Sequence, residues 1–103
     1  MASDELYTKI MAVNVTGTWN IGTAVIRRMA QQESLSATGL LPGSERTLGA
    51  GNIVNIASGG ALRGIGGMAV YSASKHAVLG LTRSWAKDWP SLRINAVAPG
   101  MLE

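Results

Sequence analysis

Tyr71 and Lys75 stand four residues apart in a segment with helical composition, and Ser58 lies thirteen residues before the tyrosine, at the end of an apolar run. On a helix, residues i and i+4 share one face about 5–6 Å apart at Cβ, so we expect the Lys75 ammonium beside the Tyr71 phenol. A nearby positive charge favours the phenolate form of a tyrosine. Such a tyrosine exchanges a proton with a carbonyl or alcohol oxygen, which a serine hydroxyl can hold. The three residues predict carbonyl–alcohol interconversion.

Each of these residues also has a purely structural interpretation. A Tyr-x-x-x-Lys pair occurs on many helices, where the lysine is solvated and the tyrosine packs by its ring. Ser58 alone is equally well a turn residue at the end of a strand. Asn14, in the middle of a predicted helix, is by itself most simply a neutral, partly exposed position. The spacing between Ser58 and Tyr71 is what favours the chemical interpretation.

Four ordered segments resemble the classical short-chain dehydrogenase/reductase family. The resemblance covers nearly all of the chain but only about half of the family's domain. It implies that the glycine-rich turn receiving the cofactor pyrophosphate and the segment that covers the substrate are both outside this sequence. The matching segments are NVTGT at 14–18, GNIVNIAS at 51–58, YSASK at 71–75 and RINAVAPG at 93–100.

The resemblance implies an NAD(P)-dependent oxidoreductase that moves a hydride between a nicotinamide cofactor and a substrate carbon. It implies that Ser58 positions the substrate oxygen and that Tyr71 is the acid and base. It further implies that Lys75 assists the tyrosine and binds the cofactor ribose, and that Asn14 anchors a proton relay leading to the lysine. The cofactor-binding residues would be Asn14, Tyr71, Lys75 and the Pro99-Gly100 turn. The choice between NAD and NADP stays open, and so does the identity of the substrate.

The predicted fold class is α/β, a partial Rossmann-type doubly wound parallel sheet in one partial domain over residues 1–103. Ser3, Asp4 and Glu5 are typical of a helix start because the cap and the acids suit its N-terminus. We expect each strand to be buried on both faces, as in parallel sheets. The expected order is a helix over 4–31, a strand over 53–57, a helix over 69–87 and a strand over 94–98.

Two polar or glycine-rich segments connect these elements. Residues 33–52 predict a long loop with an insertion at 34–49, since Pro42-Gly43-Ser44 and Gly49-Ala50-Gly51 are turn signals. Residues 59–68 contain five glycines, but the sequence lacks the Lys-Ser/Thr that follows a phosphate-binding loop. We interpret this second segment as a mobile loop near the substrate.

Composition excludes several classes of protein. With 103 residues, 47% hydrophobic and 15% charged, the chain has globular composition, which excludes a disordered protein. It contains no cysteine, so disulfides and thiolate metal sites are absent. His76 is the only histidine, so we predict that it is a helix-surface residue and not a metal ligand.

Charge and hydropathy bear on partners and location. The net charge of +3 comes from scattered basic residues that are not interleaved with aromatics, which argues against nucleic-acid binding. There is neither an apolar stretch long enough to span a membrane nor a charged-then-apolar leader. The sequence therefore favours a cytoplasmic protein that acts on a small-molecule carbonyl or alcohol.

A competing hypothesis is an interaction module. The resemblance implies that helices equivalent to 4–31 and 69–87 pack against a second subunit, so the intact enzyme would be a homo-oligomer. This chain, without the pyrophosphate cradle, would then be catalytically silent or nearly so and would self-associate through those helices. A third alternative is that the chain does not fold by itself.

Overall fold

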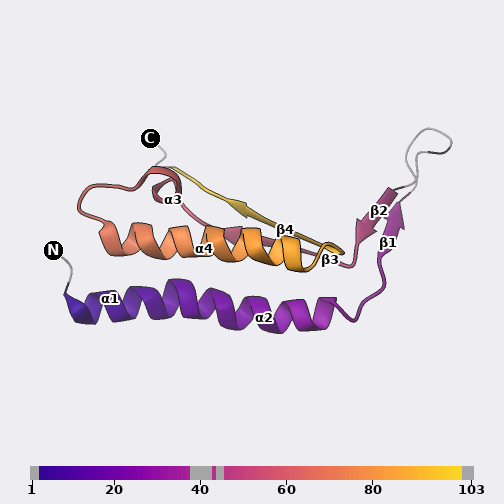
Figure 1. Ribbon diagram of the computed structural model, residues 1–103, viewed down its shortest axis with the longest axis horizontal. Helices are drawn as coiled ribbons and strands as arrows, with labels where there is room; N and C mark the ends of the chain where they lie inside the picture. The colour runs from indigo at the N-terminus through magenta and orange to yellow at the C-terminus, as the bar shows by residue number, and fades with distance from the viewer. Residues whose placement is uncertain (1–2, 38–42, 44–45, 101–103) are drawn as a thin grey trace.

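The computed structural model describes residues 3–37, 43 and 46–100, which form two long helical rods, a two-stranded parallel sheet and a hairpin (Figure 1). Figure 1 shows the first helical rod running beside α4, with β3 and β4 along α4 and the hairpin projecting from one end. The predicted α/β class is confirmed. The elements are α1 Asp4–Met11, η1 Ala12–Thr16, α2 Gly17–Met29, β1 Leu35–Ala37, β2 Arg46–Gly49, β3 Gly51–Ile56, α3 Gly60–Arg63, α4 Ala69–Asp88 and β4 Leu92–Val97.

The first rod begins where the sequence predicted. Ser3 is the N-cap of α1, and its Oγ accepts a hydrogen bond from the Leu6 N–H at 3.1 Å. Asp4 and Glu5 occupy the first turn, where they complement the positive end of the helix dipole. The backbone stays right-handed helical through Ala12 and Gly17, so α1, η1 and α2 form one continuous rod.

The rod differs from the predicted regular helix because η1 is a π-helical turn. Asn14 lies inside η1, and the Gly17 N–H closes the wide turn on the Ala12 carbonyl. The Thr18 hydroxyl donates to the Asn14 carbonyl at 2.7 Å. A π turn adds only one residue to a helix, so the hydrophobic periodicity of the sequence does not reveal it. Such turns are frequent at functional sites.

The sheet consists of β3 and β4, which run parallel with Gly51 opposite Leu92 and Ile56 opposite Val97. The prediction that each strand is covered on both faces is wrong for this chain. Residues of β3 alternate between half-buried and exposed, and every second residue of β4 is exposed as well. Val54 and Ile56 of β3 are 54% and 57% exposed. The reason is that one face packs on helices, while the described residues place no layer on the other.

The core lies between the sheet and both rods. Gly22 of α2 is buried because the Trp85 indole packs directly on its backbone, so that an added Cβ would overlap Trp85 Cη2. Trp19 packs beside the same indole with ring centroids 6.0 Å apart. The main buried cluster consists of Ile26, Ala50, Trp85, Leu92 and Ile94, and Ala57 and Val78 form a second one nearer the candidate site.

The segment predicted as a loop over 33–52 contains two strands. β1 and β2 pair antiparallel, with Ser36 opposite Thr47 and an irregularity after Leu35. The predicted turn at 49–51 is confirmed, because the chain bends at Ala50 between β2 and β3 and Gly49 has a φ of +85°. The sequence did not predict this hairpin because the segment contains polar residues, and strand pairing depends on the residues across the ladder more than on composition. Residues 38–42 and 44–45 lie outside the described residues, and the insertion at 34–49 stays a prediction.

The glycine-rich segment over 59–68 is not entirely loop. It contains the short helix α3, which ends at Gly64 with a φ of +72°. Gly67 also has a positive φ, of +77°, just before α4 begins. Glycine tolerates this left-handed backbone without steric cost, so these two glycines shape the turn from α3 into α4.

Candidate functional site

The carboxyl ends of β3 and β4 meet at one edge of the sheet. Ser58 follows β3 by two residues, and Pro99 follows β4 by two residues. The Ala57 N–H donates to the Val97 carbonyl and the Gly59 N–H donates to the Pro99 carbonyl, both at 2.8 Å. Ligands of open α/β sheets bind outside the carboxyl ends of the strands. The structure places both residues at the edge where the sequence predicted them.

The hydroxyl of Ser58 is oriented by the turn into α3. The Gly60 N–H donates to Ser58 Oγ at 3.2 Å, and the serine side chain is half-buried. A hydroxyl has one proton and two lone pairs, so this bond uses only its acceptor capacity. Among the residues that the structure describes, the Ser58 proton has no acceptor, so it can be donated to the oxygen of a carbonyl or alcohol.

Tyr71 and Lys75 lie one turn apart on α4, as their spacing predicted. Lys75 Nζ lies 5.9 Å from the centroid of the Tyr71 ring, at the outer reach of a cation–π contact. The same ammonium donates to the Ile56 carbonyl at 3.0 Å. Lys75 thus ties the face of α4 that carries Tyr71 to the end of β3.

One cavity of about 790 Å³ brings five of the predicted residues together. Its walls combine a hydroxyl from a strand end, a phenol and an ammonium from a helix, and the turn after the second strand. The cavity requires both strand ends and the first turns of α4, which are far apart in the sequence. The predicted residues that line it are Ser58, Tyr71, Lys75, Pro99 and Gly100.

Asn14 is the predicted site residue that does not line this cavity. Its amide Nδ2 instead donates to Ser74 Oγ at 3.0 Å. The Ser74 hydroxyl in turn donates to the Tyr71 carbonyl at 2.7 Å. Asn14 therefore reaches the site through Ser74 and the main chain of Tyr71, and its part in a proton relay stays a prediction.

The sequence interpretation missed two buried serines beside the tyrosine. Ser74 is fully buried, and Ser72 is buried with no hydrogen-bond partner for its Oγ among the described residues. Serine is unfavourable in a helix interior unless its hydroxyl bonds back to a carbonyl. Two serines on either side of Ala73 were therefore a usable signal, although nothing in the sequence connected Ser74 with Asn14.

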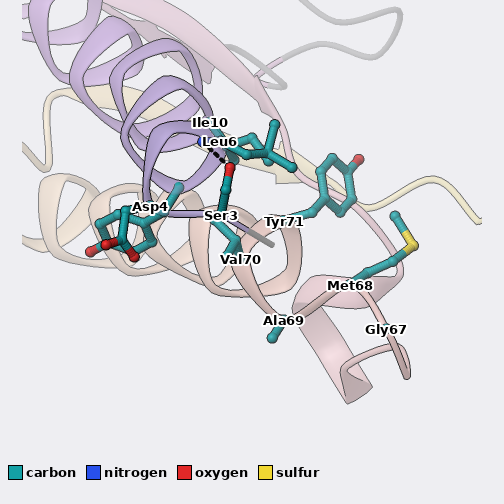
Figure 2. Close-up of a pocket in the computed structure, with 10 residues that line it drawn as sticks. Ser3, Asp4, Leu6, Ile10, Gly67, Met68, Ala69, Val70 and Tyr71 are labelled. Carbon is teal, nitrogen blue, oxygen red and sulfur yellow. Dashed lines mark hydrogen bonds between the residues drawn. The ribbon is translucent and has the colours of Figure 1, made fainter. Parts of the chain in front are cut away.

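A second cavity, of about 610 Å³, opens between the beginnings of α1 and α4 (Figure 2). Its walls are mainly apolar and include Leu6 and Ile10 from α1 and Val70 from α4. Met68 and Tyr71 line this cavity as well as the first one. The two cavities are therefore neighbours that share the tyrosine.

His76 lies on the surface of α4, as predicted. Its Nδ1 donates to the Ser72 carbonyl at 2.7 Å, one turn earlier in the helix. Within residues 3–37, 43 and 46–100, no three His, Asp or Glu side chains are grouped so as to hold a metal ion. In the same ranges, no helix combines the length and the apolar character that crossing a membrane requires.

The chain is similar to several reductases and dehydrogenases. It is 40% identical over 100 residues to an uncharacterized oxidoreductase of Thermotoga maritima, which covers 95% of this chain and 34% of that protein. It is 43% identical over 77 residues to levodione reductase of Leifsonia aquatica, covering 67% of this chain and 29% of the reductase. It is 42% identical over 101 residues to 2-(R)-hydroxypropyl-CoM dehydrogenase of Xanthobacter autotrophicus, covering 96% and 34%.

A solved structure agrees with these similarities. A mutant of 4-hydroxyisoleucine dehydrogenase, complexed with NADH and succinate, superposes with a TM-score of 0.75 at 27% identity, over 98% of this chain and 36% of that one. The chain thus spans about a third of the length of the relatives it matches. None of these matches supports the interaction-module hypothesis. Since the family model for short chain dehydrogenases matches residues 1–103, the chain belongs to the short-chain dehydrogenase family.

Proposed function

We propose that this chain carries the substrate-positioning and proton-transfer part of an NAD(P)-dependent oxidoreductase, which interconverts a carbonyl and an alcohol by hydride transfer. The observation that carries the proposal is the single cavity lined by Ser58, Tyr71 and Lys75 at the carboxyl ends of two parallel strands. Family membership and the NADH named with the solved relative support it.

Ser58 and Tyr71 act on the substrate oxygen. The Ser58 hydroxyl, whose acceptor capacity is used by Gly60, donates to that oxygen and orients it. The Tyr71 phenol gives its proton to the oxygen during reduction and takes it back during oxidation. The nearby Lys75 ammonium stabilises the negative charge that develops on the phenol oxygen.

The residues present fit the nicotinamide end of the cofactor. The cavity combines the cationic Lys75 and the Tyr71 hydroxyl, which suit the hydroxyl groups of a ribose, with the main chain after β4 at Pro99 and Gly100, which suits a carboxamide. The bound cofactor supplies or accepts the hydride. The chain's own residues hold the ribose, orient the substrate oxygen and move the proton.

The substrate contains an apolar part in this proposal. The second cavity shares Tyr71 and Met68 with the first, and its Leu6, Ile10 and Val70 walls are apolar. A substrate whose oxygen lies at Tyr71 can place carbon-rich groups there. Burial of apolar surface then contributes about 25 cal/mol per Å² to its binding.

Binding of reduced nicotinamide mononucleotide tests the proposal on this chain. This ligand carries nicotinamide and ribose without the adenosine half, so it needs only the residues described above. We expect saturable binding, followed by nicotinamide fluorescence, that weakens roughly 10- to 100-fold in Lys75→Met because a charge-assisted hydrogen bond is lost. Lys87→Met, at the exposed end of α4, is the matched control and should bind like the parent.

Two results would contradict the proposal. One is the absence of saturable binding by a chain that far-UV circular dichroism shows to be folded. The other is equal binding by the Lys75→Met and Lys87→Met variants, since this would place the ligand away from the cavity. Turnover by the chain alone is expected to be at or near background.

A further inference from the structure

Two hydrogen-bonded relays of identical chemistry connect α4 to its neighbours. In the first, the Asn14 amide donates to Ser74 Oγ at 3.0 Å, and the Ser74 hydroxyl donates to the Tyr71 carbonyl at 2.7 Å. In the second, the Asn55 amide donates to Thr82 Oγ1 at 2.9 Å, and the Thr82 hydroxyl donates to the Val78 carbonyl at 2.8 Å. Both hydroxyls are buried, but only the first relay ends at the candidate site.

The polarity of the first relay follows from the groups it contains. The Tyr71 carbonyl can only accept, so the Ser74 proton must point to it. Toward Asn14, Ser74 Oγ can therefore only accept a hydrogen bond, and the donor must be the NH₂ group of the Asn14 amide. Ser74 is 0% exposed, so neither bond is exchanged for water without opening the helix packing.

A second hydrogen bond anchors the same turn of α4, residues 71–75. Lys75 Nζ donates to the Ile56 carbonyl at 3.0 Å, just before Ser58 at the end of β3. The turn 71–75 is therefore anchored to the strand end by Lys75 and to the π-helical turn η1 by Ser74. These two anchors fix the position of the Tyr71 and Lys75 side chains relative to Ser58.

We propose that Ser74 is a positioning residue, which transmits the position of Asn14 in η1 to the main-chain carbonyl of Tyr71. The proposal rests on the proposed function, in which Tyr71 transfers the proton. In this proposal the role of the π turn η1 is to direct the Asn14 amide toward α4. Ser74 itself does not line the cavity, so it acts only through the tyrosine.

A fluorine probe on Tyr71 tests the proposal without requiring turnover. The chain has only two tyrosines, so Tyr7→Phe leaves position 71 as the single site for 3-fluorotyrosine. In that background we compare Ser74→Ala with Thr82→Val, because each removes one buried hydroxyl of equivalent chemistry. We expect both to lower the urea midpoint, but only Ser74→Ala to move the fluorine resonance and to weaken mononucleotide binding about fivefold.

A second pair of variants tests the polarity and covers the case in which Ser74→Ala does not fold. Asn14→Asp replaces the donating amide with an acceptor, so the Ser74 proton turns away from the Tyr71 carbonyl. Asn55→Asp introduces the same charge at the control relay. The fluorine resonance should move in Asn14→Asp and stay in place in Asn55→Asp.

Two patterns would overturn the proposal. Equal fluorine shifts in the variants of both relays would mean that Ser74 has only a structural role. An unmoved resonance in both Ser74→Ala and Asn14→Asp would mean that the relay does not control Tyr71. The fluorine result is independent of cofactor binding, so it separates failure of this proposal from failure of the proposed function.

Discussion

Hydroxyl groups show most clearly how single residues determine this site. Ser58 accepts from the Gly60 N–H, and its proton has no acceptor among the described residues, whereas Ser74 uses its proton and one lone pair within the protein. The same side chain is thus suited to substrate contact in one place and to positioning in the other. The difference lies in the neighbouring groups, because the chemistry of the residue is unchanged.

Ser58→Ala should lower the free energy of unfolding as well as remove the proposed substrate contact. It deletes the acceptor of the partly buried Gly60 N–H, a loss of about 1 kcal/mol. Urea denaturation followed by circular dichroism measures this. Ser84→Ala, at an exposed position on α4, should stay within about 0.5 kcal/mol of the parent. Equal effects of the two substitutions would show that the Gly60 bond contributes nothing.

The elements differ in why they contain glycine and serine. Gly22 of α2 allows the Trp85 indole to approach the helix backbone, whereas no described atom outside the backbone of α4 lies within 4 Å of the Cβ position of Gly80. The buried positions of α4 include Ser72, Ser74 and Thr82 beside Val78 and Trp85. The packing of the two rods therefore depends on close contact and hydroxyl bonds as much as on an apolar face.

Gly22→Ala and Gly80→Ala should change stability in opposite directions. Alanine forms helix better than glycine by up to about 1 kcal/mol, so Gly80→Ala should stabilise the chain by roughly 0.5–1 kcal/mol. Gly22→Ala should destabilise it by about 1–3 kcal/mol, because its methyl overlaps the Trp85 ring. Thermal unfolding, followed by circular dichroism and tryptophan fluorescence, measures both changes in stability. Stabilisation by Gly22→Ala would show that the two rods do not pack through Trp85.

Removal of the Ser3 cap tests where the first rod begins. Ser3→Ala loses the acceptor of the Leu6 N–H and should cost about 1 kcal/mol. Ser3→Asp keeps an acceptor and adds a charge that suits the helix N-terminus, so it should match or exceed the parent. The urea denaturation midpoints of the two variants measure these changes in stability. An unchanged midpoint in Ser3→Ala would show that the helix begins at another residue.

At the scale of the whole molecule, the described residues cover only one face of the sheet. Val54, Ile56 and Val97 are 54%, 57% and 46% exposed on the two strands. Contiguous exposed apolar surface of this kind favours association. The chain spans about a third of the length of its relatives, and the sheet formed by β3 and β4 has two strands.

The purified chain should therefore associate in a concentration-dependent way through the exposed sheet face. Val54→Thr keeps the β-branched shape but lowers the hydrophobicity of that face, so it should shift the chain toward monomer in sedimentation velocity. Leu62→Thr, on α3 and 64% exposed, removes apolar surface elsewhere and should leave association unchanged. If Leu62→Thr disperses the chain and Val54→Thr does not, a different surface is responsible.

The sequence by itself determined the α/β class, the Ser3 cap, the extent of the second long helix and the spacing that brings Lys75 beside Tyr71. These features are local: capping, a 3.6-residue period and the i, i+4 relation act within one element. Only the tertiary structure decided the π turn at Asn14, the Gly22–Trp85 approach, the β1–β2 hairpin and the bond from Asn14 to Ser74. The hairpin, the Gly22–Trp85 approach and the Asn14–Ser74 bond depend on which groups meet between separate segments of the chain; the bonded Asn14 and Ser74, for example, are 60 residues apart. Packing, not local propensity, selects such contacts.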